Sequence, residues 1–305
     1  MLSALLRSVP IEIYTPLRQN AVGLPRGSLR RNISIYILKR VIRAYRGRLA
    51  GAVPEIRPMD IREISFLPSD SMVMEAVYWF GTGGYEGRMA DTWMALCRNA
   101  RAILEVGGNV GLFTTIGARS GTARYTVVEP VPAVARILRA NLERNGVSHV
   151  ELVEAAAVAG DADPMVELNI PDAHRGAPVG AFVTGAEGAP TATVPPISVA
   201  AVSFPRLANG CDLIKIDAEG IEADLLGSAR ELLIAQRTRL IVEVLPGSVR
   251  LAQLLRDMAS QSGQRLFVIP AWGSDALIEI APADFGADVP DRHHSKDVLL
   301  ADAAP

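Results

Sequence analysis

An apolar strand, a glycine-rich turn and a helix follow one another from residue 102, and this unit constrains the fold more than any other segment. Ala102–Val106 is apolar apart from Glu105, the turn runs from Gly107 to Gly111, and a helical pattern begins at about Leu112. Alternating strand and helix patterns continue along most of the remaining chain. Such alternation is typical of an α/β fold with a mainly parallel sheet.

The periodicity divides the chain into a basic arm, residues 1–65, and a single domain, residues 66–305. In the arm, residues 1–30 show no sustained period, whereas Ile33 to Leu49 have the apolar spacing of an amphipathic helix. An insertion at about 160–210, rich in Gly, Pro and Thr, is expected to form a lid or a substrate-binding hairpin. Further strands are predicted at 125–129, 149–153, 165–170, 194–199, 213–216, 240–245, 266–269, 277–280 and 297–300.

Charge is distributed unevenly, although the formal net charge is only −2. Residues 1–50 contain ten Arg or Lys and one acid, Glu12, whereas the remainder contains 21 bases and 32 acids. No run approaches the roughly 18 apolar residues of a membrane-spanning helix, and no basic segment precedes the short apolar start. Two cysteines, Cys97 and Cys211, are too few for a disulfide framework. These features predict a cytoplasmic protein.

The glycine-rich turn has the chemistry of a site for a cationic nucleoside. Gly107 and Gly111 let the backbone approach a ligand where a Cβ atom would collide, and the next helix starts with unpaired N–H groups. The spacing differs from the G-x-G-x-x-G dinucleotide fingerprint. Glu105 would repel a pyrophosphate but suits the sulfonium of S-adenosylmethionine, and Glu129, at the end of the next strand, would reach a ribose diol. The pattern favours a class I methyltransferase over a ligand-free turn.

Three segments resemble the FkbM-type methyltransferases. They are Ile103-Leu-Glu-Val-Gly-Gly-Asn-Val-Gly-Leu-Phe113, Val127-Val-Glu-Pro-Val-Pro132 with Asn141-Leu-Glu-Arg-Asn145, and Leu213-Ile-Lys-Ile-Asp-Ala-Glu-Gly-Ile-Glu222. The third segment is the most specific, and the resemblance covers about residues 78–300. Two departures are mild: Glu105 stands where the family more often has Asp, and Gly108 where it more often has Ala.

The resemblance implies a Rossmann-like fold, with a central, mostly parallel seven-stranded sheet and helices on both faces. It also implies S-adenosylmethionine-dependent O-methylation of a hydroxyl on a sugar, polyketide-type natural product or glycan, with S-adenosylhomocysteine as product. We predict that the cofactor is held by Tyr85, Glu105, Gly107, Gly108, Asn109, Gly111, Glu129 and Asp217.

The catalytic candidates follow the fourth core strand. Asp217 ends this strand, at the sheet edge where reacting groups meet in open α/β folds, and is the first choice as base or metal ligand. Glu219 is a second catalytic candidate, with the alternative that it is an acid favourable near a helix start, a role that suits Glu222 better. Lys215 lies in the buried strand on the same side as Asp217. A buried ion pair that orients Asp217 is the favoured interpretation for Lys215, and a directly catalytic lysine is the alternative.

Other candidates are more weakly indicated. Glu243 ends the fifth core strand and, with Asp217, could bind a divalent metal, which two carboxylates are too few to establish. His174 and Arg175 in the insertion, and His293-His294, are acceptor-side candidates. Tyr85 is placed on a predicted helix over residues 85–99, where it would cover the methionine end of the cofactor or pack in the core.

Two rival functions stay open at this point: N-methylation of a small-molecule amine, and a non-catalytic cofactor-binding or scaffold protein of the same fold. The acceptor is expected to be a small molecule or glycan rather than a nucleic acid. The basic helix at residues 33–49 is expected to dock on its own domain or to form a homodimer, with peripheral membrane contact as the less favoured alternative.

Overall fold

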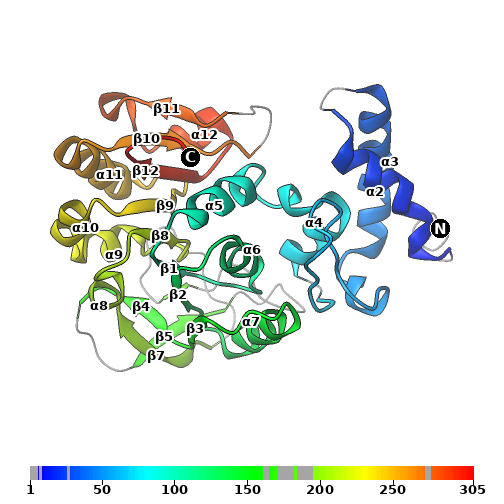
Figure 1. Cartoon of the computed structure of the whole chain (residues 1–305), viewed down its shortest axis with the longest axis horizontal. Helices are drawn as coiled ribbons and strands as arrows, with labels where there is room; N and C mark the ends of the chain where they lie inside the picture. The colour runs from blue at the N-terminus through cyan, green and yellow to red at the C-terminus, as the bar shows by residue number, and fades with distance from the viewer. Residues whose placement is uncertain are drawn as a thin grey trace.

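A large sheet with helices on both faces forms the centre of the computed structural model (Figure 1). The model describes residues 6, 9–25, 28–69, 71–160, 165–170, 182–183, 195–271 and 276–305. The strands of the sheet, in spatial order, are β11 (Ile278–Ile280), β10 (Arg265–Val268), β12 (Asp297–Ala301), β9 (Arg239–Glu243), β8 (Leu213–Ile216), β1 (Ala102–Val106), β2 (Arg124–Val128) and β3 (Val150–Val153).

Strand direction brings several segments to one edge of this sheet. β3, β2, β1, β8 and β9 run parallel to one another, whereas β12 is antiparallel to both β9 and β10. The carboxyl ends of the parallel strands therefore lie beside the beginning of β12. The predicted α/β class is confirmed. The described sheet has eight strands rather than the seven predicted for the fold type, because β11 adds an outer antiparallel strand to β10.

The strands at the centre of the sheet are apolar because both of their faces are covered. All residues of β1 and β8 are buried, as expected for parallel strands between two helical layers. One layer contains α5 (Met89–Arg98), α6 (Leu112–Ser120) and α7 (Pro132–Arg144). The other contains α8 (Phe204–Ala208), α9 (Glu222–Ser228), α10 (Arg230–Gln236) and α11 (Val249–Ser262), followed by η4 (Pro282–Asp284) and α12 (Val289–His293).

A second, smaller sheet occupies the region of the predicted insertion. Its strands, in spatial order, are β4 (Ala156–Val158), β7 (Ile197–Ser203), β5 (Met165–Asn169) and β6 (Phe182–Val183). β5 and β7 pair antiparallel and correspond to the two strands predicted in this region, whereas β4 pairs parallel with β7. Much of the insertion lies outside the described residues, so its role as a lid stays a prediction.

The N-terminal segment is more ordered than its sequence suggests. It forms η1 (Ile11–Tyr14), α2 (Thr15–Gly23), α3 (Leu29–Tyr45) and η2 (Leu49–Gly51), and is followed by α4 (Met72–Phe80) and η3 (Thr82–Gly84). Helix α2 begins within residues 1–30, where no helical period is evident. Its Pro16 lies in the first helical turn. A proline is tolerated there because N–H groups of the first turn have no hydrogen-bond partner within the helix.

Aromatic packing joins the N-terminal helices to α4. The ring of Trp79 contacts Tyr14 and Tyr45 at centroid distances of 6.3 and 6.0 Å. Buried Arg18 donates to the carbonyl of Tyr78 at 2.7 Å and stacks on the Tyr78 ring. These contacts bury one side of α3, through Leu38 among others, and leave its opposite side exposed. Among the described helices, none combines the length and apolar composition needed to cross a membrane.

Candidate active site

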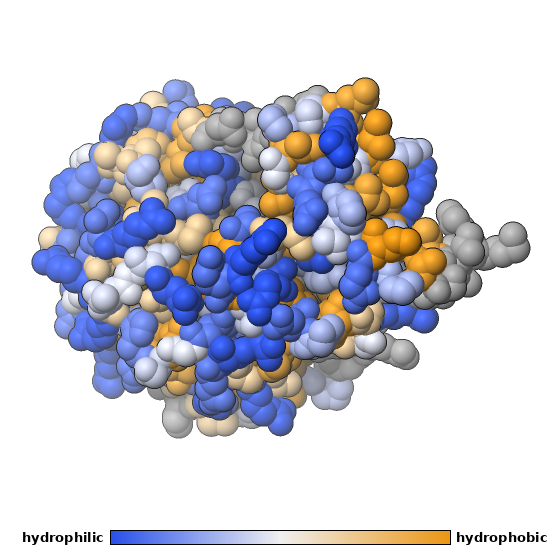
Figure 2. Space-filling model, turned by 45° about the vertical axis from the view of Figure 1, so that its right-hand side comes forward, coloured by the Kyte–Doolittle hydropathy of each residue, from blue (hydrophilic) through white to orange (hydrophobic). Residues whose placement is uncertain are grey.

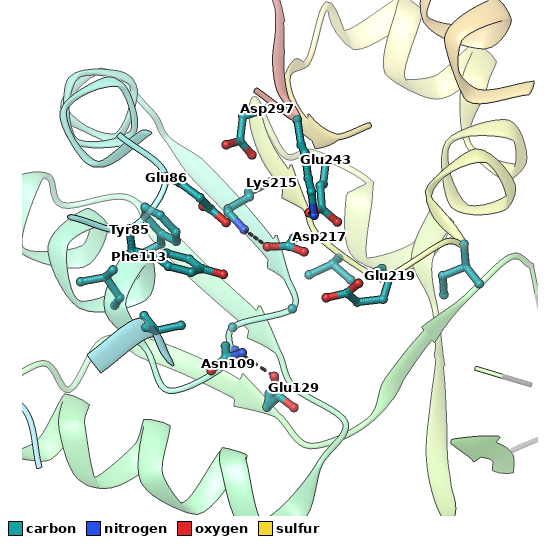
Figure 3. Close-up of a pocket in the computed structure, with 18 of the residues that line it drawn as sticks. Tyr85, Glu86, Asn109, Phe113, Glu129, Lys215, Asp217, Glu219, Glu243 and Asp297 are labelled. Carbon is teal, nitrogen blue, oxygen red and sulfur yellow. Dashed lines mark hydrogen bonds and ion pairs between the residues drawn. The ribbon is translucent and has the colours of Figure 1, made fainter. Parts of the chain in front are cut away.

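A cavity of about 620 Å³ opens at the carboxyl edge of the large sheet. Its walls come from the loops after β1, β2, β8 and β9, from the start of β12, and from β4 and β5 of the smaller sheet. Figure 3 shows two groups of polar side chains in it. Asn109 and Glu129 lie at one end, which we call the turn end, and Lys215, Asp217 and Glu243 lie at the other, the acidic end.

The turn end is built by close approach of backbone segments. The N–H groups of Gly107 and Gly108 donate to the carbonyl of Val128 at 2.9 and 3.1 Å, which ties the turn to β2. Gly107 has φ +86°, and a Cβ atom there would collide with the carbonyl oxygen of Asp217. The turn therefore brings the ends of β1, β2 and β8 together in a way that a bulkier residue would prevent.

Glu129 has the position that the sequence predicts for a ribose-binding acid. Its carboxylate lines the cavity and accepts N–H groups from Asn109 at 2.8 Å and from Val131 at 2.9 Å. Burial raises the pKa of Glu129 to about 7, although these two N–H groups lower it. Each oxygen keeps a lone pair after accepting one N–H group, so the carboxylate can also accept hydrogen bonds from a diol.

Two predicted cofactor ligands lie outside the cavity. Glu105 is fully buried and accepts hydrogen bonds from Thr114 Oγ1 at 2.8 Å and from Tyr125 Oη at 2.6 Å. The alternation of side chains along β1 directs Glu105 toward the α6 layer, so it supports the turn from behind and does not line the cavity. Gly111, at φ +87°, is the N-cap residue of α6, lies beside Leu138 and is likewise absent from the cavity wall.

The acidic end contains the buried pair that the sequence predicts. Lys215 is 2% exposed, and its Nζ lies 3.0 Å from Asp217 Oδ2. Burial alone would lower the pKa of Lys215, but Asp217 and the nearby carboxylates raise it above its ordinary value. Lys215 therefore keeps its proton at neutral pH and cannot act as a base, which favours the orienting role over direct catalysis.

Glu219 and Glu222 have different roles in the loop before α9. Glu219 lines the cavity in a left-handed conformation at φ +54°, before the helix rather than at its start. Burial raises the pKa of Glu219 to about 7, and Asp217 contributes. Glu222 accepts N–H groups from Ala218 and Gly220 at 2.9 and 3.0 Å, so it shapes the loop. Of the two, Glu219 is the one available to a bound molecule.

Several residues of the acidic end are not evident from the sequence. Asp297 pairs in register with Glu243, and Lys296 Nζ lies 3.1 Å from Glu243 Oε1. Glu86, just before α5, has a buried Oε2 with no hydrogen-bond partner among the described residues, as does Glu243. One signal was present: the chain has only three lysines, and two of them, Lys215 and Lys296, line this cavity.

Three carboxylates at the acidic end are close enough to share a metal ion. One oxygen each of Asp217, Glu219 and Glu243 lies within 4.8 Å of the others. However, Lys215 and Lys296 already place an ammonium group against Asp217 and Glu243. Because these ammonium groups supply positive charge that a metal would otherwise provide, the donor set fits a divalent cation poorly.

The remaining predicted residues are placed as follows. Tyr85 lines the cavity and packs against Phe113 at a centroid distance of 6.3 Å, but it lies in the loop before α5 rather than on the helix. His294 lines the cavity and His293 does not. His174 and Arg175 lie outside the described residues.

The buried carboxyls predict that stability falls as pH rises. Burial raises the pKa of Glu243 to about 9, and that of Glu219 to about 7, from an ordinary value of 4.5. At pH values between the ordinary pKa of 4.5 and the raised pKa of each group, the folded protein binds more protons than the unfolded chain. The free energy of unfolding therefore decreases as pH rises. Urea unfolding of the ligand-free protein should show this decrease from about pH 5 to about pH 9.

The variant Glu243→Gln isolates the upper part of this window. Above about pH 8 the carboxyls whose pKa is raised to about 7, Glu219 and Glu129 among them, are mostly ionised, whereas Glu243 still binds a proton and contributes to the decrease that remains. The free energy of unfolding of the variant should therefore decrease less than that of the wild type between about pH 8 and about pH 9. A wild-type protein whose free energy of unfolding is constant or rises over this range would contradict the raised pKa of Glu243.

Three solved methyltransferase structures are among those similar to this chain. The structure of an FkbM methyltransferase from Methylobacillus flagellatus KT is 14% identical, with a TM-score of 0.40, and the alignment covers 95% of this chain but only 58% of that one. An O-methyltransferase from Bacillus cereus in complex with S-adenosylhomocysteine is 14% identical, with a TM-score of 0.36 and coverage of 69% and 78%. An RNA methyltransferase from Salinibacter ruber is 14% identical, with a TM-score of 0.30 and coverage of 50% and 72%. No curated protein matches the sequence.

The strand order, the glycine turn after β1 and the acid after β2 define the class I methyltransferase fold. A family model described as the methyltransferase FkbM domain matches residues 105–261, which is about half of the chain. The chain belongs to this family of methyltransferases, as its three sequence segments predict.

Proposed function

We propose that the protein transfers a methyl group from S-adenosylmethionine to a hydroxyl group of a sugar or polyketide-type acceptor. The observation that carries this proposal is a single cavity that joins Glu129 and the glycine turn to Asp217 and Glu219. A nucleoside-binding end and a proton-accepting end therefore share one cavity, which is the arrangement that alkylation of an alcohol requires.

The turn end fits the cofactor. Glu129 is 5% exposed, lines the cavity and retains acceptor capacity for a ribose diol. Apolar side chains of Val128 and Val131 line the same cavity and offer surface for a purine ring. Its volume of about 620 Å³ lies within the range of small-molecule sites. When bound, the cofactor supplies a methyl group activated by its sulfonium charge.

The acidic end supplies a proton acceptor, which an alcohol needs in order to act as a nucleophile. An alcohol becomes reactive when its proton is accepted in the transition state. Asp217 is our first choice for this acceptor, because it lies at the strand end and Lys215 holds its carboxylate in place at 3.0 Å. Glu219 is the second choice, because its pKa of about 7 is close to neutral pH.

N-methylation is the alternative reaction at the same site. A neutral amine has its own lone pair and needs less help from a base. The acid-rich surroundings of Asp217 would hold an amine in its protonated form, which has no free lone pair, and this favours a hydroxyl acceptor. The presence of both Glu129 and Asp217 in the cavity lining argues against a scaffold protein without turnover.

A transfer assay without added metal tests the proposed function. The protein is incubated with methyl-labelled S-adenosylmethionine and a panel of glycosides, polyketide-type alcohols and matching amines, and products are located by mass spectrometry. We expect methyl ethers, at a rate that a chelator such as EDTA does not change, because the ammonium groups of Lys215 and Lys296 already contact two of the three clustered carboxyl groups. Methylated amines alone would replace the O-methylation proposal, and a loss of activity with EDTA restored by Mg²⁺ would contradict the metal-free site.

A further inference from the structure

The outer face of α3 combines exposed apolar and basic side chains. Leu29, Ile33, Tyr36 and Ile37 are 75%, 49%, 61% and 37% exposed. Together with Ile13 in η1, they make up five of the eight large apolar side chains that are exposed in the described part of the chain. Figure 2 shows apolar residues gathered on the side of the molecule formed by the N-terminal helices. This concentration differs from the single exposed apolar residues that are normal on a protein surface.

Basic residues surround these apolar side chains, and acids are absent from the segment. Between Glu12 and Glu55 the sequence contains no Asp or Glu. Arg30, Lys39 and Arg43 are exposed and form no ion pair with the described residues. Arg40 stacks on the ring of Tyr36 at 3.8 Å and donates to its carbonyl, so it lies directly over an apolar member of the face. We call this set of residues the α3 face.

A second copy of the chain is a poor occupant of the α3 face. In a symmetric dimer the same patch meets itself, so Lys39, Arg40 and Arg43 would face a partner surface that carries bases and no acids. Docking on the acidic domain of another copy would match charge but not apolar surface. On that domain the exposed large apolar side chains of the described residues are only Met72, Met165 and Val249, which belong to three separate elements.

We propose that the α3 face binds the surface of a lipid bilayer that contains anionic headgroups. Apolar side chains on one helix face, bordered by Arg and Lys, are the features by which a helix lies in the plane of a membrane interface. The apolar side chains enter the headgroup boundary, and the long basic side chains reach the phosphates. The opposite side of α3 stays packed on the protein, which brings the whole enzyme to the membrane surface without a spanning helix.

Sedimentation of the full-length protein with vesicles tests this proposal independently of methyl transfer. Vesicles of phosphatidylcholine alone are compared with vesicles in which about one third of the lipid is phosphatidylglycerol. We expect binding to the anionic vesicles at low salt, little binding to the neutral ones, and at least tenfold weaker binding near 1 M salt, where charges are screened within about 3 Å.

Two pairs of substitutions separate the charged and apolar contributions. Arg40→Gln with Arg43→Gln should weaken binding at least tenfold, because each basic residue near an anionic surface contributes about fivefold. Ile33→Ser with Ile37→Ser should weaken it by a similar factor. The control variants Arg136→Gln and Val249→Ser, exposed on α7 and α11, should bind as the wild type does. Circular dichroism verifies that all variants are folded.

Two outcomes would overturn the proposal. One is equal binding of the wild-type protein to neutral and anionic vesicles, or binding to neither at low salt. The other is a dimer in sedimentation velocity without lipid that the Ile33→Ser and Ile37→Ser pair dissociates, which would assign the α3 face to a second copy. Neither outcome bears on cofactor binding, which is measured separately.

Discussion

Replacing Asp217 by asparagine is expected to lower kcat for methyl transfer about a thousandfold, within the range typical of a lost general base. Asparagine has nearly the same shape and still offers an oxygen to Lys215, so the buried lysine keeps a partner. The amide cannot accept a proton from the acceptor hydroxyl. Affinity for S-adenosylhomocysteine, measured by calorimetry, should change little, because Asp217 lies at the acidic end of the cavity and Glu129 at the turn end.

Two further variants serve as a control for Asp217→Asn and as a test of the second proton acceptor. Asp257→Asn removes a carboxylate on α11, remote from the cavity lining, and should leave kcat unchanged. Glu219→Gln tests the second proton acceptor: a loss of the pH dependence of kcat near 7 would identify Glu219 as the group that titrates. Full turnover by Asp217→Asn would exclude Asp217 as the base.

Replacing Glu129 by alanine is expected to raise KM for S-adenosylmethionine about a hundredfold. On the proposed function the variant would lose two hydrogen bonds from the ribose diol to the Glu129 carboxylate, each expected to contribute about tenfold or more in affinity. It also leaves the N–H groups of Asn109 and Val131 without their acceptor, so the glycine turn loses a fixed position. The value of kcat at saturating cofactor should fall much less than kcat/KM, because Asp217 and Lys215 are untouched.

The matched control for this variant is Glu143→Ala, an exposed glutamate on α7. It should leave KM for the cofactor unchanged. Glu129→Gln should give an intermediate KM, because the amide keeps only one acceptor oxygen for the two N–H groups and the diol. An unchanged KM in Glu129→Ala would show that the ribose, if bound in this cavity, is held by another group.

The sequence predicts those features that depend on local pattern. The apolar runs of β1, β2 and β8 indicate buried parallel strands, because both faces of such strands are covered. The pairing of Lys215 with Asp217 follows from side-chain alternation along one strand and from the cost of burying an unpaired charge. The position of Glu129 follows from the rule that ligands bind at the carboxyl ends of parallel strands.

Other features depend on tertiary contacts that a local pattern does not contain. Asp297 and Lys296 join the acidic end because β12 is antiparallel, so its beginning rather than its end lies at the carboxyl edge. The sequence pattern predicts that Glu105 binds the cofactor. Its position in the strand instead directs its side chain away from the cavity, toward Tyr125 and Thr114. Glu86 reaches the cavity from a loop before α5, and no periodicity indicates where a loop will lie.

The central claim is that the cavity beside the glycine turn holds the adenosyl cofactor. Calorimetric titration of the wild-type protein with S-adenosylhomocysteine tests it most directly, with Glu129→Ala measured in parallel. We predict binding to one site with a dissociation constant in the micromolar range, weakened about a hundredfold in the variant. No heat of binding in the wild type, or equal affinity in the two proteins, would contradict the assignment of this cavity.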